Sequence, residues 1–103
     1  MKVRLLAAAS LELDDALAWY GGQSPVLERR FLEEIGKGRA RIAEYPNAWH
    51  PLGEGVRQFR LERFPYGLIY VITASEIVVM AIAHLHREPD YWRDRIPKGS
   101  TLK

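Results

Sequence analysis

The stretch "YGLIYVI" (66–72), "TAS" (73–75), "EIVVMAIAH" (76–84) decides the fold. Both outer runs are rich in Val, Ile and Tyr, which favour strands. Only three residues separate them, and a connection this short joins antiparallel neighbours. The run 76–84 is apolar on both of its faces, so we expect it to be the central strand, covered on both sides.

A third strand precedes these two. The segment "VRQFRL" (56–61) has strand composition, and "ERFP" (62–65) is a short connection to the next strand. The three segments therefore predict an antiparallel meander. The segment before them, "PNAWHPLGEG" (46–55), reads as a loop because it is rich in Pro, Gly and Asn.

Upstream of that loop, the apolar period becomes helical. In "SLELDDALAWY" (10–20), Leu13, Ala16, Leu17 and Tyr20 recur at the spacing of one helix face. The glycine pair at 21–22 is expected to end this first helix.

A second helix is predicted to begin directly afterwards. Ser24 offers an N-cap oxygen and Pro25 suits the first helical position. Pro46 is expected to end this helix. Gly38 lies on the inner face, where it would let another helix come close. The remaining inner-face positions are Leu27, Phe31, Ile35, Ile42 and Tyr45.

These elements predict an α+β fold. Residues 3–6 can form a short strand, followed by an antiparallel helical hairpin and by the three-stranded antiparallel meander that completes one sheet. The chain of 103 residues suits one domain, which we place at 1–96, with a polar C-terminal tail at 97–103. No apolar run is long enough for a transmembrane helix, so we expect no membrane association. The lack of cysteine fits a cytoplasmic protein.

The charge pattern gives two readings. A net charge of +2 is small for a dedicated nucleic-acid binder. Arg57, Arg60 and Arg63 nevertheless recur at every third residue. They form either a solvated strand edge protected against aggregation or a patch that binds an anionic partner.

The segment "HLHREPDYW" (84–92) holds the residues that could carry chemistry. His84 and His86 share one face if the strand continues that far. Two such imidazoles can bind zinc, but a site needs a third ligand and His50 is the only other histidine. We therefore expect no metal and no other cofactor. A structural role for His84 is a strand-end histidine that bonds a carbonyl group.

Acid/base chemistry on RNA is a further possibility. Attack by a 2′-hydroxyl needs a base, an acid and cations that stabilise the phosphorane. Histidine, arginine and tyrosine supply these functions. The candidate catalytic residues, if the chain cleaves RNA, are Arg60, Arg63, His84, His86, Arg87 and Tyr91. The alternative is that Pro89 and Asp90 form a turn and that Trp92 anchors the exit segment on the core.

Taken together, several of these motifs resemble the RelE/ParE superfamily of bacterial toxins. The similar segments are "LELDDALAWY", "RFLEEIGKGRARIAEYPNAW", "PLGEGVRQFRLERFPYGLIYVI", "EIVVMAIAH" and "HREPDYW", which extend from about Leu6 to Trp92. The resemblance implies the toxin of a type II toxin–antitoxin module, which inhibits bacterial growth.

The resemblance also implies partners. A small cognate antitoxin neutralises the toxin by folding a disordered segment over the helical hairpin and the sheet, which gives a hetero-oligomer. The residues that we assign to antitoxin binding are Leu13, Leu17, Tyr20, Leu27, Phe31 and Ile35. The cellular target is either DNA gyrase, as in ParE-like members, or mRNA on the ribosome, as in RelE-like endoribonucleases.

One position bears on the target. Nuclease members usually carry an arginine just after the position that matches Tyr66, and here Gly67 stands there. This glycine and the small net charge favour a ParE-like protein that poisons DNA gyrase without nuclease activity. A degenerate member that binds an antitoxin without toxicity is the further alternative.

Overall fold

The computed structural model describes residues 1–97, so the tail predicted at 97–103 lies outside the described residues except for Pro97. The strands are β1 (Lys2–Leu5), β2 (His50–Gly53), β3 (Val56–Arg60), β4 (Tyr66–Ile72) and β5 (Glu76–His84). The helices are α1 (Ala7–Gln23), α2 (Pro25–Glu44) and the short 3-10 helix η1 (Arg93–Arg95). None of the helices in this described part is long and apolar enough to cross a bilayer.

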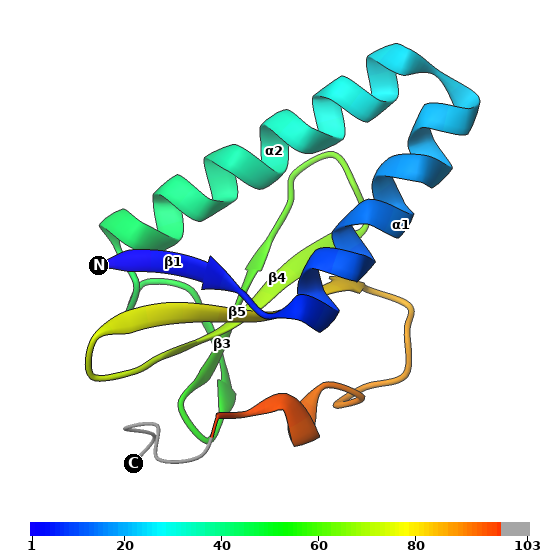
Figure 1. Cartoon of the computed structure of the whole chain (residues 1–103). Coiled ribbons are helices and arrows are strands. Elements are labelled where there is room, and N and C mark those ends of the chain that lie inside the picture. Colours follow the sequence, from blue (N-terminus) through cyan, green and yellow to red (C-terminus); the bar gives the residue numbers. More distant parts are fainter. Residues whose placement is uncertain (98–103) are drawn as a thin grey trace.

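The five strands form one sheet in the order β1-β5-β4-β3-β2. The predicted meander is confirmed, because β3, β4 and β5 pair antiparallel in sequence order. β1 joins β5 in parallel. The two helices cover one face of the sheet, and the C-terminal segment crosses the other (Figure 1). β5 is covered on both faces as predicted, although β4 is the middle strand.

The helical hairpin forms as predicted, but α1 runs through both glycines to Gln23. The predicted stop at 21–22 is therefore wrong. The break falls at Ser24, whose extended backbone (φ −165°, ψ 131°) reflects the restriction that a following proline places on the preceding residue. The Ser24 hydroxyl accepts hydrogen bonds from the backbone N–H of Val26 and Leu27, which confirms the predicted N-cap.

The loop predicted at 46–55 contains the edge strand β2, so that prediction is wrong in part. Pro51 argued against a strand in this segment, because proline cannot donate a ladder hydrogen bond. A sheet edge nevertheless tolerates proline. Tyr45, predicted on the inner face of α2, is mostly exposed because the backbone leaves the helix at this residue.

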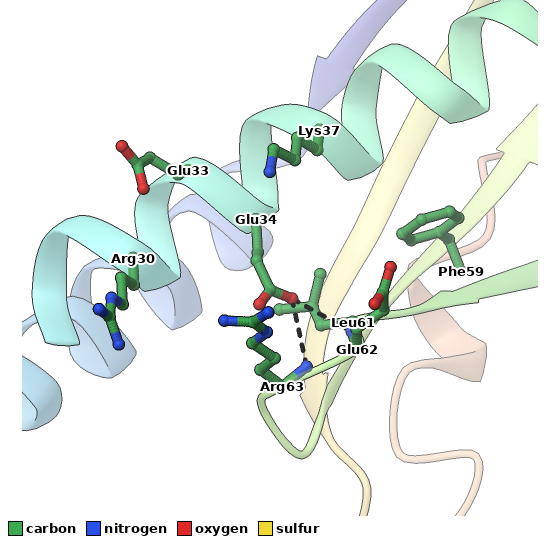
Figure 2. A pocket seen from close by; sticks show the side chains of 8 residues that line it. All are labelled: Arg30, Glu33, Glu34, Lys37, Phe59, Leu61, Glu62 and Arg63. Atoms are coloured by element: carbon green, nitrogen blue, oxygen red, sulfur yellow. Dashed lines mark hydrogen bonds between the residues drawn. The ribbon is translucent and has the colours of Figure 1, made fainter.

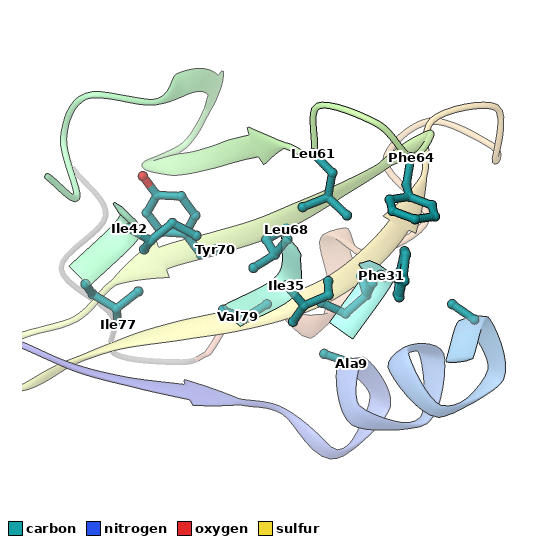
Figure 3. Packing of buried hydrophobic residues seen from close by; sticks show 12 residues of the cluster. Ala9, Phe31, Ile35, Ile42, Leu61, Phe64, Leu68, Tyr70, Ile77 and Val79 are labelled. Carbon is teal, nitrogen blue, oxygen red and sulfur yellow. The ribbon is translucent and has the colours of Figure 1, made fainter. Parts of the chain in front are cut away.

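The main core lies between the hairpin and the sheet. Phe31, Ile35 and Ile42 of α2 face Leu68 and Val79 of the sheet (Figure 3). Gly38 does permit a close approach, as predicted, but to a strand residue and not to a helix. A Cβ atom at this position would lie 3.1 Å from Cε1 of Phe59.

A second core cluster covers the opposite face of the sheet. Trp92 of the C-terminal segment is 4% exposed and packs with Val56, Ile69, Val71 and Met80. The predicted anchoring role of Trp92 is confirmed.

A β-bulge in β5 determines where the strand's last residues point. Tyr70 pairs with Val79 but Ile69 pairs with Ala81, so Met80 is the extra residue. Met80 and Ala81 consequently both pack in the cluster on the second face. The bulge reverses the alternation, and His84 lies opposite Tyr66 on the helix side.

Candidate functional site

A groove runs between α2 and the outer edge of β3. Two adjoining cavities form it, of about 280 Å³ and 450 Å³, and they share Lys37, Phe59 and Glu62. Figure 2 shows the first cavity, with the charged side chains of α2 on one side and the β3–β4 turn on the other.

Glu34 fixes the wall of this groove. Its Oε1 accepts hydrogen bonds from the backbone N–H groups of Glu62 (3.1 Å) and Arg63 (3.4 Å), drawn as dashed lines in Figure 2. One carboxylate on α2 therefore holds the turn between β3 and β4 in place.

The second cavity of the groove combines aromatic rings with cations. The rings of Trp49 and Phe59 meet edge to face at 4.7 Å. Lys37, Arg41 and Arg60 also line this cavity. β2 pairs with β3 only as far as Gln58, so the outer edge of β3 beyond that residue has no neighbouring strand within the described residues. This edge can accept an extended peptide of acidic or aromatic character.

A separate cavity of about 180 Å³ lies on the other face of the sheet, beneath the C-terminal segment. Four of the six candidate catalytic residues contribute to its lining, which are Arg60, His84, Arg87 and Tyr91, although the ring of His84 packs against Tyr66 on the helix side. His86 does not line it, and Arg63 lines the groove beside α2 instead.

Tyr91 forms a hydrogen bond with a residue outside the lining of this cavity. Its hydroxyl donates a hydrogen bond to Glu12 Oε2 at 2.9 Å. Burial, first, and the bond to the Glu12 carboxylate, second, raise the pKa of Tyr91 to about 12. At neutral pH the phenol is therefore a poor proton donor.

Glu12 is the centre of a network that the sequence did not reveal. It accepts hydrogen bonds from Arg95 Nη1 (3.0 Å) and from the backbone N–H of Ile82 (3.0 Å). Arg95 also donates to the carbonyl oxygen of Met80. β1 pairs with β5 only up to Val79. The network thus satisfies the edge of β5 beyond β1 and ties the C-terminal segment to α1. The partners lie 70 or more positions from Glu12 along the chain, so no local pattern signals them.

The two histidines contact each other but not on a strand face. β5 ends at His84, and His86 lies in the following turn, so the predicted continuation of the strand is wrong. The predicted carbonyl partner of His84 is replaced by an N–H group, because Nδ1 of His84 accepts from the backbone N–H of His86 at 3.1 Å. His50 belongs to β2 at the sheet edge, three strands from β5.

Gly67 lies on β4 between two residues of the cavity lining, Arg60 of β3 and Ala83 of β5. It pairs with Arg60 on one side and with Ala83 on the other. A Cβ atom at this position would lie 2.8 Å from Nε2 of Gln58. The amide of Gln58 occupies the space that a larger residue at 67 would need.

The residues assigned to antitoxin binding occupy different environments. Phe31 and Ile35 are buried (0% and 2% exposed), and their assignment to a binding surface is wrong because they form the core between α2 and the sheet. Leu13, Leu17 and Tyr20 are half-buried against the same core, and Leu27 is also half-buried. The large apolar side chains that the hairpin does expose are Leu11, Trp19, Val26 and Leu32.

Comparisons with known proteins identify the family. The solved structure described as "Chromosomal ParDE TA system from P. aeruginosa" superposes with a TM-score of 0.67 at 18% identity, covering 82% of this chain and 96% of that one. At this identity the likeness shows a shared fold. A search of curated protein sequences gives no match. A sequence model of the ParE toxin of type II toxin–antitoxin systems, parDE, matches residues 3–91. The chain belongs to this family of ParE toxins.

Proposed function

We propose that this toxin arrests bacterial growth by acting on DNA gyrase in the cytoplasm, without cleaving RNA. The observation that carries the proposal is the hydrogen bond from the Tyr91 hydroxyl to Glu12, which directs the phenolic proton to a residue outside the cavity lining. Gly67, which pairs with Arg60 and Ala83 of the cavity lining, supplies no cation at its own position. The small net charge also suits a target other than the ribosome, where many phosphate contacts are needed.

The ribonuclease alternative rests on Arg60, His84 and Arg87, which line one cavity. Under that alternative, the histidines must move protons, and removing a general acid or base lowers a rate by about 10²–10⁴-fold. Under the gyrase proposal they have no such role.

The double variant His84→Ala/His86→Ala is therefore expected to arrest growth as strongly as the parent chain when each is induced alone in bacteria. Soluble expression and circular dichroism should first establish that the variant is folded. Loss of growth arrest in a folded variant, together with ribosome-dependent mRNA cleavage by the parent, would favour the nuclease. Normal growth on expression of the soluble parent would favour the degenerate, non-toxic alternative.

We also propose two surfaces for the antitoxin, with which the toxin forms a hetero-oligomer. A helix of the antitoxin packs on the exposed apolar side chains of the hairpin, where Trp19 is 63% and Leu32 51% exposed. An extended stretch then enters the groove between α2 and β3, next to the Trp49–Phe59 pair. Leu13, Leu17, Tyr20 and Leu27 border the hairpin contact.

The variant Trp19→Ala is expected to weaken antitoxin binding by at least about 2 kcal/mol, because exposed tryptophans at interfaces are typical hot spots. Calorimetric titration of the antitoxin measures the change. Its control is Leu85→Ala, which removes an exposed apolar side chain in the turn after β5, outside the hairpin and the groove. Equal affinities for Trp19→Ala and the parent would contradict the proposed hairpin contact.

A further inference from the structure

Arg60 and Gln58 stand between two cavities. Both residues line the 450 Å³ cavity of the groove, and both also line the 180 Å³ cavity on the sheet face beneath the C-terminal segment. A ligand in either cavity therefore lies against Arg60.

We call the 180 Å³ cavity on the sheet face the face cavity. It has apolar residues in its lining and two arginines, Arg60 and Arg87, with few anionic partners. Ile69 and Ala83 form part of its lining, together with Trp92. The side chain of Arg60 makes one long hydrogen bond, 3.4 Å from Nε to Gln58 Oε1, and within residues 1–97 no carboxylate lies within salt-bridge distance of it.

Arg87 is held in place without being neutralised. Its guanidinium stacks over the ring of Tyr91 at 3.9 Å from the centroid. Its one ion pair, to Glu12 Oε2, is long at 3.5 Å, and Arg95 already pairs with that carboxylate at 3.0 Å. Arg87 is therefore positioned to bind a further anion.

Two carboxylates in the lining of the cavity discriminate between classes of anion. They belong to Glu88 and to Asp90, which is 60% exposed and pairs with Arg93 at 3.3 Å. These carboxylates would repel a polyanionic backbone that passes across the opening. A single carboxylate that enters between the arginines, followed by apolar contact with the floor, meets no such series of repulsions.

We propose that the face cavity receives the carboxylate of an aspartate or glutamate side chain on the protein target, held between Arg60 and Arg87. An antitoxin segment in the groove also binds Arg60, so the antitoxin and the target compete for this residue. This inference rests on the proposed function, in which the target is a protein.

Acetate is the probe that tests the cavity, by NMR titration of the isolated protein at constant ionic strength. Saturable shifts are expected at the amide of Ala83 and at the indole N–H of Trp92. The variant Arg60→Gln should weaken acetate binding about tenfold, the effect of losing one charge-assisted hydrogen bond. The control Arg63→Gln, outside the cavity, should bind as the parent does. Absence of a saturable response, or equal weakening by both variants, overturns the proposal.

Two further arms separate the alternatives. Inorganic phosphate and a short single-stranded RNA should bind no more tightly than acetate. Much tighter RNA binding would mean that the cavity binds a nucleic acid and not a protein carboxylate.

The complex with the cognate antitoxin should not respond to acetate, and an unchanged response would overturn the competition at Arg60. The acetate titration needs no gyrase. Failure of gyrase inhibition with acetate binding intact would count against the proposed target, whereas inhibition without acetate binding would count against the cavity.

Discussion

Replacing Trp92 with alanine is expected to lower the free energy of unfolding by about 3–5 kcal/mol, the range for truncating a buried tryptophan. Trp92 is 4% exposed and packs on the second face of the sheet, against Val56, Ile69 and Met80. The helices α1 and α2 cover the opposite face, and the exit segment with its short helix η1 provides the cover here (Figure 1). Urea unfolding followed by circular dichroism measures the change without relying on tryptophan fluorescence.

Trp19→Ala is the matched control for this experiment. Trp19 is 63% exposed on α1, and its removal should change the stability by less than about 0.5 kcal/mol, as for other surface substitutions. A loss below about 1 kcal/mol for Trp92→Ala, or equal losses for both variants, would show that the segment after β5 does not cover the sheet.

The second large effect is expected for Glu12→Ala, with a loss of about 2–4 kcal/mol. The change removes the acceptor of the Ile82 N–H and of the Tyr91 hydroxyl, and it leaves Arg95 without its carboxylate. The side chain of Glu12 is 13% exposed, so solvent replaces these contacts poorly. Hydrogen exchange of the Ile82 amide should accelerate more than that of amides within the β4–β5 ladder.

Asp15→Ala is the control, because Asp15 is an exposed acidic residue one turn further along α1. It should leave both the stability and the Ile82 exchange rate near those of the parent. If Asp15→Ala and Glu12→Ala had the same effect, the general charge of α1 would be responsible and the network would not.

The sequence was informative where local chemistry determines structure. Apolar periodicity predicted the hairpin and the meander, and Ser24 with Pro25 predicted the start of α2, because a cap and a proline act within a few residues. The glycines at 21–22 are also a local signal, but they led to a wrong prediction of where α1 ends. Glycine in a helix costs about 1 kcal/mol, which does not by itself end one.

Features that depend on tertiary contacts could not be predicted from the sequence. The bulge at Met80 coincides with the end of β1 pairing, and this reverses the side to which His84 points. Periodicity identified the inner face of α2, and the sheet covers that face, so Phe31 and Ile35 belong to the core and not to a binding surface. Glu12 gave no signal, since its partners come from β5 and the C-terminal segment.

A supercoiling assay with purified DNA gyrase, in parallel with an mRNA cleavage assay on translating ribosomes, separates the two possible targets most directly. We expect the purified toxin and its His84→Ala/His86→Ala variant to inhibit gyrase equally. We also expect the cognate antitoxin to abolish the inhibition and the mRNA to stay intact. Unimpaired gyrase activity, together with mRNA cleavage by the parent that the histidine variant has lost, would contradict gyrase as the target.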